Sequence, residues 1–177
     1  MIRCYVTNRR SGDLLSHVKA AVQDGVDMIQ VREKDLEARD LYDLVCRVRD
    51  AAAGSGTKVL VNDRLDIALA AAIEGVHLPA SGLPAARVRP FVRLLGCSTH
   101  TLPEALQAEQ DGADFVFFGP VFETPGKSPV GLAALSEVAR GVRIPVLAIG
   151  GITLENAAHA VEAGASGIAA IRLFQQG

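Results

Sequence analysis

Short apolar runs rich in Val, Ile and Leu recur along the chain, and the segments between them carry helical spacing. The runs cover residues 2–7, 27–32, 58–62, 75–78, 94–98, 114–119, 145–150 and 167–171. The amphipathic segments between them include residues 14–23, 38–53, 102–110 and 153–163, with apolar side chains at i, i+3, i+4 and i+7. Regular alternation of strands and helices predicts a parallel sheet.

A weak internal repeat indicates how this sheet closes. The stretches QDGVDMIQVR, IEGVHL, QDGADFVFFG and EAGASGIAAI each combine a helix end, a Gly and an apolar strand, at the second, fourth, sixth and eighth strands. A repeat on alternate strands favours a (β/α)₈ TIM barrel, whose interior layers come from alternate strands, over an open doubly wound sheet. We expect one domain over residues 1–177, in the α/β class.

The barrel must be compact, because barrels of this type usually have at least about 200 residues. Few residues follow position 171, so the last helix should be short or missing. The first and eighth strands then need cover from the first helix or from another subunit, and we expect a homo-oligomer.

The charge and the cysteines exclude several classes of protein. The net charge is −2 and the arginines are scattered, which argues against a nucleic-acid surface. No apolar run reaches the roughly 18 residues of a membrane span or resembles a signal peptide. Three cysteines far apart argue against a disulfide framework or a zinc site. These features favour a cytoplasmic protein that binds a small molecule.

Cations follow the second and sixth strands, where the βα loops of a barrel build its active site. Gln30, Arg32 and Lys34 are spaced by two residues and therefore lie on one side of an extended chain. They predict an anion clamp, although ion pairs with Glu33 or Asp35 are an equally simple interpretation. Thr124 and Lys127 lie in a Gly- and Pro-containing loop that suits a flap over an anion, or is a surface turn.

Paired glycines follow the seventh strand. Gly150 and Gly151 let backbone N–H groups approach a ligand, and a helix N-terminus follows them, which together suit a phosphate. Arg172, after the eighth strand, adds a cation to the same site.

Titratable residues follow the third and fifth strands. Asn62 and Asp63 open a helix, where a capping role competes with a metal ligand or proton acceptor at Asp63. Ser98 and His100 lie at the end of the fifth strand. Thr101 and Glu104, three residues apart, predict a capping box that fixes the loop after this strand. His100 would then lie at the mouth as a proton shuttle, or it would be a rim His bonded to the backbone.

These motifs, in order, resemble the thiamine phosphate synthase and thiazole tautomerase superfamily: QVREK, VNDRLDIALA, GVHL, STHT, GADFVFFGPVFET and IPVLAIGGIT. In the synthase branch, a pyrimidine pyrophosphate loses pyrophosphate and the thiazole phosphate nitrogen captures the carbocation. The resemblance implies pyrophosphate contacts at Gln30, Arg32, Lys34, Asn62 and Lys127, a Mg²⁺ contact at Asp63 and a pyrimidine contact at Ser98. It implies that the thiazole phosphate binds near Thr124, Gly151 and the loop after the eighth strand.

The stretch GVHLPASG departs from the synthase pattern GxHxGQxD. Pro79 and Ala80 replace the Gly-Gln pair, and Gly82 stands where synthases have their second magnesium carboxylate. In addition, Gly126 replaces a Thr of the flap, and Arg172 replaces a Ser. HLP followed by Ser and Gly is similar to the tautomerase branch, in which no metal is needed.

We therefore expect a thiamine-pathway isomerase, a thiazole tautomerase without a metal cofactor, with His100 as acid and base. The first alternative is a thiamine phosphate synthase, a transferase that uses Asp63 and Mg²⁺ and also binds a pyrimidine pyrophosphate. The second is a regulator that binds a phosphorylated ligand without turnover. A Schiff-base aldolase is disfavoured, because Lys58 begins the third strand, away from the mouth.

Overall fold

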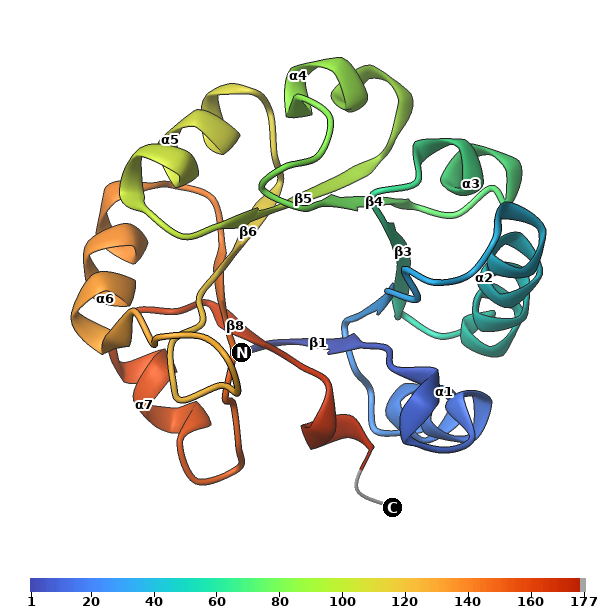
Figure 1. The fold of residues 1–177 in the computed structure, drawn as a ribbon, viewed down its shortest axis with the longest axis horizontal. Helices are drawn as coiled ribbons and strands as arrows, with labels where there is room; N and C mark the ends of the chain where they lie inside the picture. Colours follow the sequence, from blue (N-terminus) through green and yellow to red (C-terminus); the bar gives the residue numbers. More distant parts are fainter. Residues whose placement is uncertain (176–177) are drawn as a thin grey trace.

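A computed structural model describes residues 1–175 of the chain. Eight parallel strands follow one another in chain order around a closed barrel, and the first strand pairs with the eighth (Figure 1). The strands are β1 (Ile2–Val6), β2 (Met28–Val31), β3 (Lys58–Asn62), β4 (Gly75–Leu78), β5 (Leu94–Thr99), β6 (Phe115–Phe118), β7 (Val146–Ile149) and β8 (Gly167–Ala170). All eight predicted strands and the TIM-barrel fold are confirmed.

Helices surround the barrel, and two of them match the predicted limits (Figure 1). The helices are α1 (Leu14–Gln23), α2 (Ala38–Ala52), α3 (Leu65–Ala70), α4 (Ala85–Val88), α5 (Leu102–Gln110), α6 (Gly131–Gly141) and α7 (Ala157–Glu162). Three 3₁₀ turns complete the chain: η1 (Arg9–Ser11), η2 (Arg89–Phe91) and η3 (Arg172–Phe174). Within residues 1–175, β8 is followed by η3 and by no α-helix, which agrees with the prediction of a short or missing last helix.

Helix α7 begins four residues later than its apolar pattern predicts. The Asn156 side-chain oxygen accepts from the Thr153 N–H (2.8 Å), and the Thr153 hydroxyl accepts from the Asn156 N–H (3.3 Å). These reciprocal bonds satisfy the backbone in a turn, so the regular helix starts only at Ala157.

The glycines of the repeat take two different roles. Gly25, Gly112 and Gly164 follow helices and have φ angles of 70°, 88° and 107°, in the left-handed region expected of a helix C-terminus. In the repeat before β4, Ala72 takes this left-handed conformation in place of a Gly, with φ 51°. Gly75 lies inside β4, where a Cβ would stand 1.7 Å from the Leu94 carbonyl oxygen, so only Gly lets β4 and β5 approach.

The hydrophobic core has two parts. Inside the barrel, residues such as Phe115, Phe117 and Leu147 fill the space between the strands. Between the strands and the helices, a larger cluster includes Val45, Leu135 and Ile168. This double packing fixes the strand ends, from which the side chains of the site project. No helix among residues 1–175 is long and apolar enough to cross a membrane.

Candidate active site

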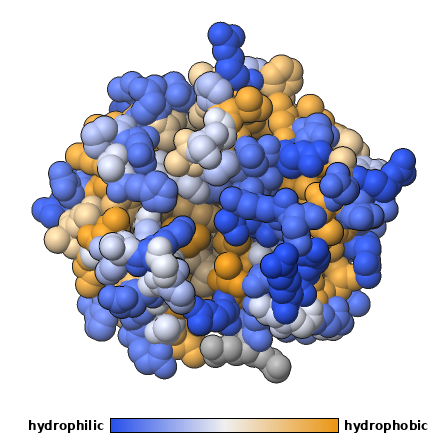
Figure 2. Space-filling view, viewed as in Figure 1, coloured by the Kyte–Doolittle hydropathy of each residue, from blue (hydrophilic) through white to orange (hydrophobic). Residues whose placement is uncertain are grey.

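The predicted site residues gather at the carboxyl ends of the strands. A cavity of about 430 Å³ opens there, and hydrophilic residues surround a central hollow in the view down the barrel (Figure 2). Its lining includes nine predicted residues: Gln30, Arg32, Lys34, Asn62, Ser98, His100, Thr124, Lys127 and Gly150. Two further predicted residues, Gly151 and Arg172, line an adjoining hollow of about 400 Å³ that shares Thr124 and Gly150.

Asp63 lies outside the main cavity. It lines a smaller hollow of about 270 Å³, which shares Lys34, Asn62 and Ser81 with the main cavity. The mouth of the barrel therefore consists of a central cavity with one adjoining hollow on the glycine side and another on the Asp63 side.

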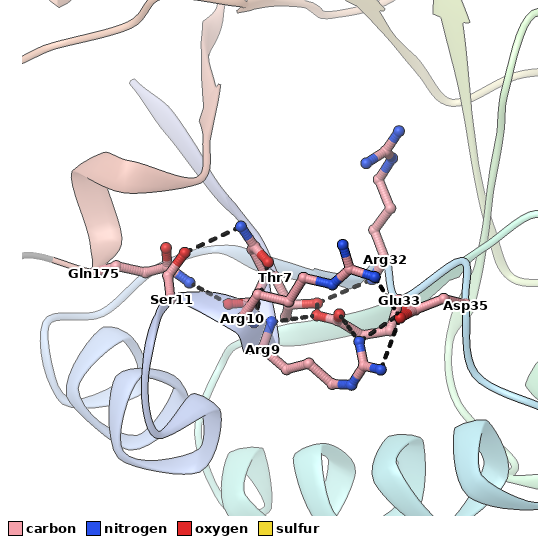
Figure 3. Close-up of polar contacts among 9 residues, drawn as sticks. Thr7, Arg9, Arg10, Ser11, Arg32, Glu33, Asp35 and Gln175 are labelled. Atoms are coloured by element: carbon pink, nitrogen blue, oxygen red, sulfur yellow. Dashed lines mark hydrogen bonds and ion pairs between the residues drawn. The ribbon is translucent and has the colours of Figure 1, made fainter.

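The carboxylates beside Arg32 and Lys34 are bound by the loop after β1 (Figure 3). Buried Glu33 accepts hydrogen bonds from the Thr7 hydroxyl (2.8 Å) and the Arg9 N–H (2.9 Å), and Arg9 Nη1 lies 3.5 Å from its other oxygen. The ion pairs of Arg32 or Lys34 with Glu33 or Asp35 are therefore not formed.

Asp35 pairs with the two arginines of the same loop. Arg9 and Arg10 each lie 2.8 Å from its carboxylate oxygens, and their hydrogen bonds hold the pKa of Asp35 well below its usual range. Among residues 1–175, neither Arg32 nor Lys34 has a carboxylate partner within ion-pair distance. Both cations are free to bind an anion in the cavity.

Asn62 and Asp63 do not cap helix α3. The Asn62 side-chain oxygen instead accepts from Gln30 Nε2 at 3.2 Å, which joins two lining residues, and the N-cap position belongs to Arg64. Asp63 has a φ of 62°, a conformation uncommon outside Gly, and its N–H donates to the His77 carbonyl at 3.0 Å. The capping interpretation is wrong at both residues.

Ser98 is paired with a buried histidine. His77 Nε2 lies 2.9 Å from Ser98 Oγ, and the imidazole stacks on Phe117 with 4.0 Å between ring centroids. Burial, with a smaller contribution from the charge of Arg32, lowers the pKa of His77 to about 3, so the ring is neutral near pH 7. Sequence analysis missed this pair, although the alternation of β4 and β5 places both residues on the inner face of neighbouring strands.

His100 joins two loops at the mouth. The Thr101 hydroxyl accepts from the Glu104 N–H (3.3 Å), as the predicted capping box requires. The second bond of the box is different, because the Glu104 carboxylate accepts from the His100 N–H (2.6 Å) and not from the Thr101 N–H. His100 Nδ1 lies 2.6 Å from the Gly119 carbonyl oxygen, which can only accept, so Nδ1 carries the proton. The imidazole therefore holds the loop after β6.

The paired glycines pack against the loop after β6. Gly150 and Gly151 have φ angles of 92° and 66°, and a Cβ on them would meet Pro120 Cα at 2.5 Å and the Glu123 carbonyl at 2.4 Å. Among residues 1–175, their amide N–H groups have no backbone acceptor. The helix N-terminus expected beside them is absent, since α7 starts at Ala157 and has six residues.

The residues at the mouth fit Mg²⁺ through a single carboxylate. No cluster of three or more His, Cys, Asp or Glu residues suited to a metal occurs in residues 1–175. A Cβ on Gly82 would stand 2.9 Å from Asp63 Oδ1, so a second carboxylate at that position would need a local shift. Mg²⁺ is often bound by one or two carboxylates together with substrate phosphates, and Asp63 supplies one.

Comparisons with known proteins identify the family. A family model described as thiamine monophosphate synthase matches residues 4–174. The chain is 43% identical to thiamine-phosphate synthase of Roseiflexus castenholzii over 176 residues, covering 94% of this chain and 77% of the relative. It is 40% identical to thiamine-phosphate synthase of Desulfitobacterium hafniense over 166 residues, covering 90% and 80% of the two chains.

A solved structure shows the same fold. Thiamine phosphate pyrophosphorylase from Pyrococcus furiosus superposes with a TM-score of 0.90 at 34% identity, covering 96% of this chain and 85% of that one.

These similarities overturn the tautomerase expectation. The relatives are named synthases, which are transferases, so the prediction of an isomerase that shifts a proton through His100 is wrong. The substitution at Gly82 in GVHLPASG does not exclude a synthase, since Mg²⁺ is often bound by one or two carboxylates together with substrate phosphates. The motifs QVREK and VNDRLD were the better guide. The chain belongs to the thiamine monophosphate synthase family.

Proposed function

We propose that this protein is a thiamine phosphate synthase, which joins a hydroxymethylpyrimidine pyrophosphate to a thiazole phosphate and releases pyrophosphate. The observation that supports it most is the lining of the main cavity. Three cations, Arg32, Lys34 and Lys127, lie around it, and no carboxylate is among its lining residues in the described part of the chain. Such a site binds a multiply charged anion more strongly than a neutral ligand.

The cations suit the bond that must break. In the proposed reaction, the carbon–oxygen bond between the pyrimidine methylene and the pyrophosphate breaks, and its electron pair leaves with the bridging oxygen. Arg32, Lys34 and Lys127 would stabilise the charge that develops on the pyrophosphate, with Gln30 and Asn62 as further hydrogen-bond donors. The thiazole nitrogen then gives its lone pair to the carbocation and forms the carbon–nitrogen bond.

Apolar and polar walls position the two rings. Phe117, Ile149 and Ile171 line the same cavity. They would exclude water from the carbocation, and the Ser98 hydroxyl would face the pyrimidine. The thiazole phosphate would lie on the glycine side, near Thr124 and the amides of Gly150 and Gly151, with Arg172 as its counter-charge.

Asp63 is the residue that would hold Mg²⁺. Its carboxylate has no hydrogen-bond partner among the side chains of residues 1–175, and the ion would neutralise part of the pyrophosphate charge when bound.

The test is to supply the purified protein with both substrates, with and without Mg²⁺, and to measure thiamine phosphate and pyrophosphate. We expect both products in the presence of Mg²⁺. Asp63→Asn should lower kcat/KM at least about tenfold and raise the Mg²⁺ concentration needed, because it removes the carboxylate proposed to hold the ion.

Asp43→Asn is the matched control, because Asp43 is exposed on α2 and should leave the rate unchanged. A folded protein that binds thiazole phosphate but forms neither product would contradict the proposal and favour the regulator.

A further inference from the structure

His77 touches the site without lining it. The ring is 1% exposed on the inner face of β4, and it is absent from the lining of the cavity, whereas its partner Ser98 lines it. Phe117 packs against the imidazole, with centroids 4.0 Å apart and 32° between the ring planes. Among residues 1–175, Ser98 is therefore the single hydrogen-bond partner of the His77 side chain, and it links that side chain to the cavity.

The two ring nitrogens of His77 have unequal surroundings. Nε2 lies 2.9 Å from Ser98 Oγ, while buried Nδ1 has no hydrogen-bond partner in the described part of the chain. Nδ1 faces Gly96 and Phe115, since a Cβ on Gly96 would stand 2.5 Å from Nδ1 and 2.3 Å from a ring carbon of Phe115. This narrow apolar space offers Nδ1 no acceptor.

A neutral imidazole carries one proton, on either nitrogen. A buried N–H donor without a partner is rarer and more costly than a lone pair without one. The proton therefore belongs on Nε2, which donates to Ser98 Oγ. Since that lone pair of the hydroxyl is then occupied, the Ser98 hydrogen is directed away from His77 and toward the cavity.

We propose that His77 is a positioning residue that makes Ser98 a hydrogen-bond donor to the ligand, so that the site selects rings presenting an acceptor, such as an sp² ring nitrogen, at this point. The proposal rests on the proposed function for the nature of the ligand. It assigns to a residue outside the cavity a part of the selectivity for the heterocycle.

A double-mutant cycle tests whether His77 acts through Ser98. His77→Phe keeps a ring but loses the donor, and we expect kcat/KM to fall about 10- to 100-fold. In a Ser98→Ala background the same change should have less than about a twofold effect. Equal losses in both backgrounds would show that His77 only packs the core, and would overturn the proposal.

Rescue separates hydrogen bonding from packing. His77→Gln places an amide nitrogen where Nε2 lies and should recover most of the activity that His77→Phe loses. His77→Asn, whose amide reaches only the Nδ1 position, should not. If Gln and Asn were equally impaired at equal thermal stability, the donor role would be refuted.

Ligand binding gives a readout that needs no turnover. Calorimetry would compare 4-amino-5-hydroxymethyl-2-methylpyrimidine with the two pyridine analogues in which one ring nitrogen is CH. The parent protein should bind one of the two analogues at least about tenfold more weakly than it binds the pyrimidine. The affinity of the parent for that analogue should be no lower than the affinity of Ser98→Ala for the pyrimidine. Equal affinities of the parent for all three rings would overturn the proposal.

Nitrogen-15 NMR of histidine-labelled parent protein measures the tautomer directly, even if a variant fails to fold. Protonation of His77 at Nε2 is expected, and protonation at Nδ1 would contradict the proposal. A protein that binds the pyrimidine with this tautomer but forms no thiamine phosphate would refute the proposed synthase activity alone.

Discussion

At the scale of single residues, Glu33 decides whether the neighbouring cations can bind substrate. Its carboxylate is buried and engaged by Thr7 and Arg9, so it does not neutralise Arg32 or Lys34 (Figure 3). The Thr7 hydroxyl in turn accepts from the Arg32 N–H at 3.0 Å, which holds the start of the loop in place. An acidic residue within the motif thus organises a cationic site.

Glu33→Gln should weaken this organisation. The glutamine side chain would keep one acceptor oxygen, but its NH₂ group would face the Arg9 guanidinium, which is also a donor. We therefore expect the free energy of unfolding to fall by about 1–2 kcal/mol. Loss of the fixed loop should also raise KM for the pyrimidine pyrophosphate several-fold. Urea denaturation and steady-state kinetics would measure both changes.

Glu137→Gln provides the control, since Glu137 is exposed on α6 and its change should alter the unfolding free energy by less than about 0.5 kcal/mol. A Glu33→Gln protein that matched this control in stability and KM would contradict the role given to the carboxylate.

The positions of the lining residues could be predicted from sequence, but their partners could not. Period-two alternation after a strand is a local property, and it placed Gln30, Arg32 and Lys34 correctly at the mouth. The partner of Glu33 is Arg9, 24 residues away in the chain, and depends on the pairing of β1 with β2. His77 and Ser98 meet across two strands in the same way.

At the scale of elements, the loop after β6 and the turn after β7 form one packed unit. The Val121 N–H donates to the Ile149 carbonyl (2.8 Å), and the Phe122 N–H donates to the Gly150 carbonyl (3.1 Å). The glycines leave no space for a side chain between the two segments. The position of Thr124 at the glycine-side hollow thus depends on both loops.

Gly151→Ala should displace this loop. Gly54 has a similar φ, 77° against 66°, but open space around it, so Gly54→Ala isolates the cost of the backbone conformation, about 1 kcal/mol. Gly151→Ala should lower the unfolding free energy by about 1–3 kcal/mol more than this control because of the steric clash.

Affinity for thiazole phosphate should also fall about tenfold in Gly151→Ala, measured by calorimetry, and should not change in Gly54→Ala. Equal stability and affinity of the two variants would show that the loops are not tightly packed.

Element limits were less predictable than element order. The apolar pattern placed α1 and α5 correctly, whereas α7 started late because the side chains of Thr153 and Asn156 bind the backbone in a turn. Such local bonds leave the hydrophobic period unchanged, so periodicity alone does not detect them.

At the scale of the whole molecule, a protein with net charge −2 has three cations and no carboxylate among the described residues that line its main cavity. Surface carboxylates elsewhere pair with arginines, as Asp114 does with Arg89 at 2.6 Å. The charge lining the main cavity is therefore opposite in sign to the net charge, which favours the approach of an anionic substrate.

Salt should screen this attraction. Raising the KCl concentration from about 50 to 500 mM shortens the Debye length from above 10 Å to below 5 Å, and KM for the pyrimidine pyrophosphate should rise several-fold. Lys127→Ala should reduce this dependence, whereas Lys19→Ala, on the exposed face of α1, should not. Binding of the uncharged hydroxymethylpyrimidine should be insensitive to salt, and an equal salt effect on both ligands would contradict the electrostatic argument.

The loop after β6 is fastened at both ends, since the Val130 N–H also donates to the Pro120 carbonyl (2.8 Å) and the Gly131 N–H to the Val121 carbonyl (3.2 Å). Between these anchors, residues 125–129 are exposed. This geometry makes the far side of the tip a place for protein engineering. Foreign peptides or a fluorescent reporter inserted after Ser128, beyond the cavity-lining Lys127, would be carried on a fixed base without altering the barrel.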